Sequence, residues 1–235
     1  MVVRVLSVLF ILFLVVGVPF LSRSTAHDGQ VRLMPRLTLY VSAAISQWAL
    51  AVAGLLIFFF SSLSAHSIGF RTPPLLTALP WTVALVALSL AGISLGLFLE
   101  ERGWWPPEPE LVRLLIPRTP REKFWSVVLL APTAALCEEF LYRGFLLAQL
   151  SEWLRSGVWA WTASSLAFGI AHIYQGWNGM VRAFLLGALL AYPVIHFGSL
   201  YPSMLAHGLI DALALAWLGP RFLAENSAQE MGKTE

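Results

Sequence analysis

Runs of apolar residues alternate with polar connections along most of this chain. The apolar segments span residues 5–21, 38–62, 76–99, 125–150, 158–174, 180–197 and 203–218. A helix of about 20 apolar residues crosses the hydrocarbon core of a bilayer, and most of these segments approach that length. Short turns between the later segments favour antiparallel neighbours. The pattern predicts an all-α, polytopic transmembrane helix bundle of about seven or eight membrane helices.

The chain divides into four parts within what we expect to be one domain. These are N-terminal membrane helices over 1–100, a polar or interfacial connection over 101–124, further membrane helices over 125–218 and a polar tail over 219–235. Residues 111–116 of the connection predict a short amphipathic turn that lies at the interface. Ser24 and Ala26 have the −3 and −1 spacing of a cleavage site, so residues 1–26 are either a signal peptide or the first spanning helix.

Composition supports the membrane assignment. Of the 235 residues, 58% are hydrophobic and 12% are charged, and the mean hydropathy is +0.74. A soluble domain carries about 25% charged residues. We therefore expect a multi-pass protein of the cell membrane, with the lipid bilayer as a partner. The net charge of +2, without a basic cluster, argues against nucleic acid as a partner.

The positions of Lys and Arg predict an orientation. The connections after the first and third apolar segments carry several of these residues, whereas the connection after the second carries only Arg71. Cationic connections favour the cytoplasmic side. The first and third connections are therefore expected in the cytoplasm and the N-terminus outside.

One apolar segment contains three charged residues close together, in the sequence Glu138-Glu139-Phe-Leu-Tyr-Arg143. Each charge at the centre of a membrane helix costs about 2.5–3.5 kcal/mol, so these side chains are expected to pair within a buried polar site. Glu139 and Arg143 are four residues apart, a spacing suited to an ion pair. Glu138 is rotated by about 100° on the same helix and is free to point elsewhere.

Two later apolar segments each project further polar side chains. Phe168 precedes His172 by four residues, and His207 precedes Asp211 by four. In an antiparallel bundle these faces can meet the charges of the earlier segment at one point. The same residues are also compatible with a structural clasp, with packing histidines, or with a transporter, proton relay or scaffold. Transporters commonly have broken helices at corresponding positions in two halves of the chain. Here these charges occupy only the second half, which argues against a transporter.

Three motifs together resemble a known family. Glu138–Arg143 matches Glu-Glu-x-x-x-Arg, Phe168–His172 matches Phe-x-x-x-His, and His207–Asp211 matches His-x-x-x-Asn/Asp. Their order and spacing are similar to those of the CPBP family of intramembrane proteases, which includes the type II CAAX prenyl endopeptidases and bacterial Abi proteins. The resemblance covers residues 120–218. It implies a glutamate-dependent endopeptidase that acts on a protein or peptide substrate at the membrane.

The resemblance also implies roles for the matching residues. Glu138 would act with His172 to hold and deprotonate the attacking water, and Glu139 would pair with Arg143. His207 would stabilise the oxyanion of the tetrahedral intermediate.

At position 211 this chain has Asp where the family often has Asn. An ionised Asp211 cannot donate a hydrogen bond to an oxyanion, so we expect it to orient His207 instead. No cofactor is expected. A zinc ion remains an alternative, because two His and a Glu can form a zinc triad, although no His-Glu-x-x-His signature occurs. The substrate class, whether a prenylated CAAX tail, a bacteriocin leader or another membrane protein, stays open.

Overall fold

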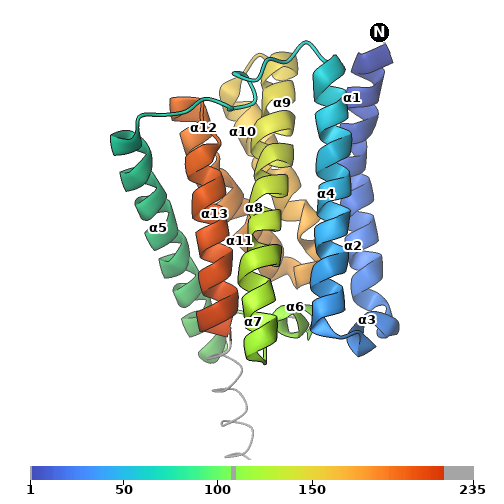
Figure 1. The fold of residues 1–235 in the computed structure, drawn as a ribbon, viewed down its shortest axis with the longest axis vertical. Coiled ribbons are helices and arrows are strands. Elements are labelled where there is room, and N and C mark those ends of the chain that lie inside the picture. Colours follow the sequence, from blue (N-terminus) through green and yellow to red (C-terminus); the bar gives the residue numbers. More distant parts are fainter. Residues whose placement is uncertain (1, 107–109, 220–235) are drawn as a thin grey trace, which may run out of the picture.

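The structure, a computed structural model, describes residues 2–106 and 110–219. The predicted all-α bundle is confirmed, and none of the described residues forms a strand (Figure 1). The helices of the first half are α1 (Val2–Leu12), η1 (Phe13–Gly17), α2 (Val18–His27), α3 (Gly29–Leu33), α4 (Arg36–Phe60), α5 (Leu75–Glu101) and α6 (Glu110–Leu115). Those of the second half are α7 (Pro120–Trp125), η2 (Ser126–Leu130), α8 (Ala131–Glu138), η3 (Glu139–Leu146), α9 (Leu147–Leu154), α10 (Gly157–Ala171), η4 (Ile173–Gln175), α11 (Gly176–Leu190), α12 (Tyr192–Phe197), α13 (Tyr201–Leu213) and η5 (Ala214–Leu218).

Five of the described helical stretches are long and apolar enough to cross a membrane. They are Val2–His27, Arg36–Phe60, Leu75–Glu101, Pro120–Leu154 and Ile173–Phe197. The two other predicted segments form shorter helices: α10 packs against α9 and α11, and α13 packs against α5 and α8. Together with the five spans, these two helices account for all seven apolar segments of the sequence.

The boundary of the central helix differs from the prediction. It begins at Pro120 rather than at 125, because Thr119 and Glu122 form a capping box. The Thr119 hydroxyl accepts from the Glu122 amide at 3.2 Å, and the Glu122 carboxylate accepts from the Thr119 amide at 3.1 Å. Such a pair satisfies two amides that have no partner within the first helical turn. The polar connection is correspondingly shorter than the predicted range of 101–124.

The predicted interfacial turn at 111–116 corresponds to the short helix α6. Two residues of α4 anchor its C-terminal end: Tyr40 donates to the carbonyl of Leu115 at 2.8 Å, and Arg36 donates to the carbonyl of Ile116 at 3.0 Å. In Figure 1, α3, α6 and α7 lie at one end of the bundle, and the connection between α4 and α5 lies at the other. The first and third connections thus share one end, as the predicted orientation requires. The predicted tail over 219–235 lies outside the described residues except for its first residue.

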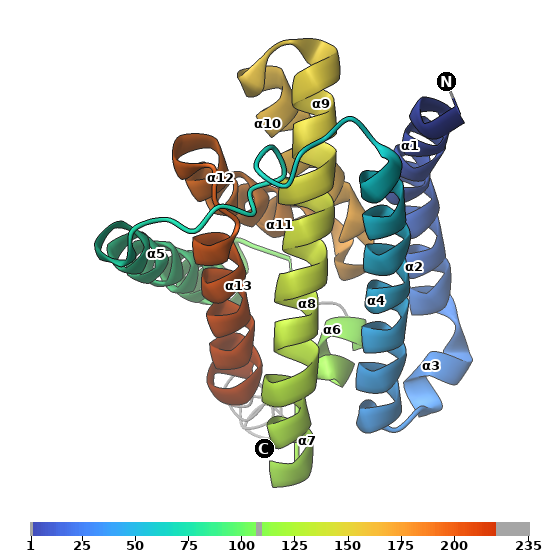
Figure 2. The same cartoon turned by 45° about the horizontal axis from the view of Figure 1, so that its top comes forward.

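The N-terminal helix packs into the main core. Phe10 and Leu14 are buried there, and the ring of Phe10 meets that of Phe145 edge to face at 5.7 Å. Cys137 is buried in the same core, as expected of a packing residue. Helix α8 lies between α4 and α13, which both contact it (Figure 2). Glu139 and Arg143 of the central helix are buried in the interior of the bundle.

Candidate active site

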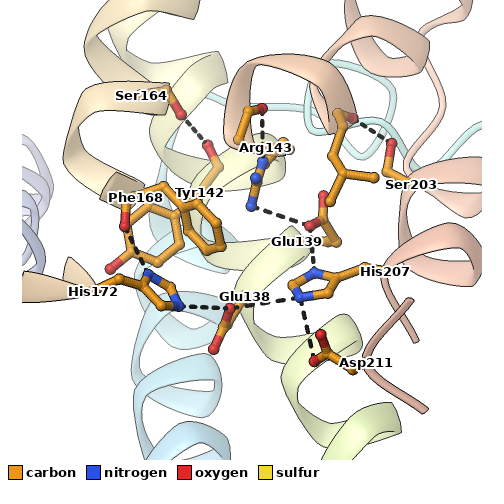
Figure 3. Close-up of polar contacts among 12 residues, drawn as sticks. Glu138, Glu139, Tyr142, Arg143, Ser164, Phe168, His172, Ser203, His207 and Asp211 are labelled. Carbon is orange, nitrogen blue, oxygen red and sulfur yellow. Dashed lines mark hydrogen bonds and ion pairs between the residues drawn. The ribbon is translucent and has the colours of Figure 1, made fainter. Parts of the chain in front are cut away.

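Glu138 and Glu139 lie at the junction of α8 and η3, near the middle of the helix that spans 120–154. The backbone over Glu139–Leu146 is π-helical, with hydrogen bonds between residues five apart instead of four. Ser164 of α10 donates to the carbonyl of Tyr142 within this stretch at 2.6 Å (Figure 3). Short π-helical turns inside α-helices occur frequently at functional sites.

The predicted ion pair between Glu139 and Arg143 is present and fully enclosed. Nη1 of Arg143 lies 3.1 Å from Oε1 of Glu139, and the two side chains are 1% and 0% exposed. Nε of Arg143 donates to the carbonyl of Gly187 at 3.4 Å, and the guanidinium group lies 3.9 Å from the centre of the Phe168 ring. A Cβ at position 187 would lie 3.3 Å from Nη2 of Arg143, so glycine leaves the room that this group occupies.

Glu139 also holds His207, a contact that the sequence did not predict. Nδ1 of His207 lies 2.8 Å from Oε1 of Glu139, and because a carboxylate oxygen accepts, Nδ1 is the donor. Asp211, the predicted orienting group, lies 3.6 Å from Nε2 of His207, beyond hydrogen-bond distance. His207 is therefore oriented by the hydrogen bond that its Nδ1 donates to Glu139.

His172 occupies the end of α10, where its backbone leaves the helix with φ −92° and ψ 15°. Its Nδ1 lies 2.8 Å from the carbonyl oxygen of Phe168, which can only accept, so Nδ1 carries the hydrogen. The neutral ring then presents the lone pair of Nε2. The ring of Phe168 packs between Arg143 at 3.9 Å and the imidazole of His172 at 4.5 Å.

The carboxylate of Glu138 is the point at which these groups converge (Figure 3). Its Oε2 lies 4.0 Å from Nε2 of His172 and 3.9 Å from Nε2 of His207. The structure thus brings together all six predicted site residues: Glu138, Glu139, Arg143, His172, His207 and Asp211. The side chains of Glu138 and Asp211 are 16% and 30% exposed, so the cluster is open on the side of these two residues.

Comparison with protein families agrees with this arrangement. Residues 120–213 match the model of the family described as type II CAAX prenyl endopeptidase Rce1-like. We call the matched residues the Rce1-like domain. Its limits coincide with the start of α7 and the end of α13, and the resemblance to CAAX-type intramembrane proteases is confirmed. A search of curated proteins and a search of solved structures each found no match.

One side chain at the site comes from outside the Rce1-like domain. Nε2 of Gln47, in α4, donates to Oε1 of Glu138 at 2.8 Å. The apolar pattern of the first hundred residues predicts membrane helices and no site residue, so Gln47 was not predicted. The sequence does indicate a buried partner for Gln47, because an amide side chain in the middle of the apolar segment over 38–62 needs a polar partner within the bundle.

A cavity of about 520 Å³ borders the Rce1-like domain away from the two histidines. Its lining includes Arg143, Ser151 and Glu152 together with residues of the connection between α4 and α5. Neither Glu138 nor any other residue that faces its Oε2 lines this cavity.

The zinc alternative depends on how closely the ligand groups approach one another. Among the residues that the structure describes, no group of three His, Cys, Asp or Glu side chains is arranged to hold a metal ion. Each of the two Nε2 atoms lies about 4 Å from Oε2 of Glu138.

Proposed function

We propose that this protein is a glutamate-dependent intramembrane endopeptidase of the cell membrane. It hydrolyses a peptide bond of a membrane-associated protein or peptide, with Glu138 as general base and no metal. The family match supports an endopeptidase acting at the membrane. The observation that carries the glutamate mechanism is the position of Oε2 of Glu138 between the Nε2 atoms of His172 and His207.

The water to be activated is held by Glu138 and His172. A water molecule within hydrogen-bond reach of both fits a gap of 4.0 Å between Oε2 and Nε2 when it lies to one side of the line that joins them. Both atoms accept, because Nδ1 of His172 already carries the ring hydrogen. The two hydrogens of one water then point at Glu138 and His172, and its oxygen lone pairs face the substrate.

The reaction follows from this placement. Oε2 of Glu138 takes a proton from the water as the water oxygen bonds to the carbonyl carbon of the substrate. The carbonyl π electrons move to oxygen and form the oxyanion. Glu138 then gives its proton to the amide nitrogen, the oxyanion re-forms the carbonyl, and the C–N bond breaks to release a carboxylic acid and an amine. The acid passes its remaining proton to the amine, so the products leave as carboxylate and ammonium. General acid–base catalysis of this kind contributes roughly 10²–10⁴-fold to the rate.

His207 stabilises the oxyanion from Nε2. Because Nδ1 donates to Glu139, Nε2 can donate as well only when the ring is an imidazolium. That form also makes the contacts of Nε2 with Glu138 at 3.9 Å and Asp211 at 3.6 Å attractive. Asp211 thus supports the charge of His207 rather than donating to the oxyanion itself.

The decisive experiment is proteolysis by the purified protein in detergent or liposomes. Wild type is compared with Glu138→Gln and Glu138→Ala, using a peptide with a prenylated CAAX tail, the same peptide without the prenyl group, and a peptide from an unrelated membrane helix. We expect Glu138→Gln to lose at least about 100-fold in kcat, because an amide cannot take the proton. Cleavage by Glu138→Gln at the wild-type rate would reject the mechanism.

A chelator arm tests the zinc alternative in the same assay. Activity of the wild type is measured before and after exhaustive treatment with a chelator, and after zinc is added back. The glutamate mechanism predicts no change. Loss of cleavage that zinc restores would replace it with a metal-dependent mechanism.

A further inference from the structure

A helix that the Rce1-like domain does not include contributes a side chain to the catalytic carboxylate. Gln47 lies near the middle of α4, and its Nε2 donates to Oε1 of Glu138 at 2.8 Å across 91 residues of sequence. The same amide presents its oxygen to the interior, where Oε1 of Gln47 is buried without a hydrogen-bond partner among the described residues. A buried polar atom without a partner is costly, so its retention needs a reason.

We propose that Gln47 is a positioning residue of the endopeptidase, which holds Oε1 of Glu138 so that Oε2 is the oxygen that activates water. This inference rests on the proposed function, since it takes Glu138 to be the general base. Gln47 touches neither the water nor the substrate in this role; it acts through Glu138.

The geometry divides the two oxygens of Glu138 between two tasks. Oε1 is engaged by Gln47, and Oε2 faces the Nε2 atoms of His172 and His207. The terminal torsion of a glutamate side chain is broad and has no strong preference of its own. Without the hydrogen bond from Gln47, rotation of the carboxylate would turn Oε2 away from the water. A displacement of about 1 Å at a reacting atom can cost about 100-fold in rate.

A neutral amide suits a base that alternates between two protonation states. The charged groups around Glu138 are His172 at the end of α10, His207 and Asp211 on α13, and Glu139 and Arg143 on η3. Further titratable side chains near it are those of Cys137, Tyr142 and Tyr174. Gln47, from α4, is uncharged. It donates from Nε2 to the carboxylate, and after a half turn of its amide it can accept from protonated Glu138 through Oε1. A lysine or arginine at this position has donors only, and would support the charged state alone.

The neighbouring residue provides a matched control. Nε1 of Trp48 donates to the hydroxyl of Thr133 at 3.2 Å, and this bond also joins α4 to α8. Trp48→Phe removes that hydrogen bond between the same two helices without touching Glu138. A role of Gln47 in docking α4 alone predicts similar effects for both substitutions, whereas a role in positioning Glu138 does not.

The test uses the full-length protein in detergent and a peptide with a prenylated CAAX tail. Gln47→Leu is expected to lower kcat by about 100-fold, while KM stays within about twofold; Trp48→Phe is expected to keep the wild-type kcat. Gln47→Glu is expected to recover activity as pH falls, because the introduced carboxyl group donates to Glu138 only when it is protonated. Thermal unfolding of each variant shows whether it is folded.

Infrared spectroscopy gives a readout that requires no cleavage. The carboxylate stretching band of Glu138 is obtained as the difference between wild type and Glu138→Gln, and we expect it to shift in Gln47→Leu but not in Trp48→Phe. An unshifted band, or equal losses of kcat in Gln47→Leu and Trp48→Phe, would overturn the positioning role. If Glu138→Gln is inactive and Gln47→Leu cleaves like wild type, this inference fails and the proposed function stands. Full activity of Glu138→Gln would reject both the positioning role of Gln47 and the proposed function.

Discussion

Oε1 of Glu139 accepts a hydrogen bond from Nδ1 of His207 at 2.8 Å and at the same time lies 3.1 Å from Nη1 of Arg143. One oxygen of this fully buried carboxylate therefore contacts both Arg143, on its own helix, and His207, on α13. The hydrogen bond at Nδ1 leaves the other ring nitrogen, Nε2, directed toward Glu138. It gives Glu139 a structural task, whereas the proposed function makes Glu138 the general base.

Breaking the pair between Glu139 and Arg143 should destabilise the protein strongly. Arg143→Met leaves the carboxylate of Glu139 buried with one partner fewer, and the loss of one member of a buried ion pair typically costs about 3–5 kcal/mol. The measurement is the free energy of unfolding in mixed detergent and SDS. Arg102→Met, at an exposed arginine near Phe98, is the control and should stay within about 0.5 kcal/mol of wild type. Equal stability of the two variants would show that the enclosed pair has no special weight.

The two polar residues of α13 should differ sharply in importance. His207→Ala removes the donor to the oxyanion and is expected to lower kcat by about 10²–10³-fold. Asp211→Asn should change kcat by less than about tenfold, because Asp211 is 30% exposed and its contact with His207 is 3.6 Å long. Steady-state cleavage of one peptide by both variants decides this. A larger loss for Asp211→Asn than for His207→Ala would reverse the assignment of the donor.

The ring of Phe168 should matter for rate as well as for stability. It lies between the guanidinium group of Arg143 and the imidazole of His172, so Phe168→Leu loosens both. Phe10→Leu removes a buried ring from the same core without contact with the site. Both substitutions should cost about 1–2 kcal/mol of stability, but only Phe168→Leu should lower kcat. If the two variants keep the same kcat, Phe168 serves packing alone.

A methyl group at position 187 tests how closely α11 approaches the site. In Gly187→Ala the new Cβ would lie 3.1 Å from the Phe168 ring and 3.3 Å from Nη2 of Arg143, so both must move. Gly92→Ala in α5 is the matched control, since a Cβ there meets nothing within 4 Å. Alanine should stabilise the helix at Gly92 by up to about 1 kcal/mol. Gly187→Ala should lower both stability and kcat, and a neutral result there would show that the neighbours yield freely.

The sequence by itself determined the features that depend on local periodicity. The apolar segments predict the helical bundle, and the spacing of Glu139 and Arg143 predicts their ion pair, because residues four apart share a helix face. The capping box at Thr119 was also readable, although the predicted boundary at 125 overlooked it. The three motifs identified the family and the six residues that gather around Glu138, before any distance was known.

Only the tertiary structure decided which helix faces meet. The contacts of Glu138 with Gln47 and of Glu139 with His207 join residues 91 and 68 positions apart. Such contacts depend on the rotation of each helix about its axis and on its depth in the bundle. Both are set by the packing of all neighbouring side chains at once. At Gly187, for example, the absence of a side chain lets α11 approach Arg143. Local periodicity therefore predicts the partners within a helix, and packing between helices selects the partners across them.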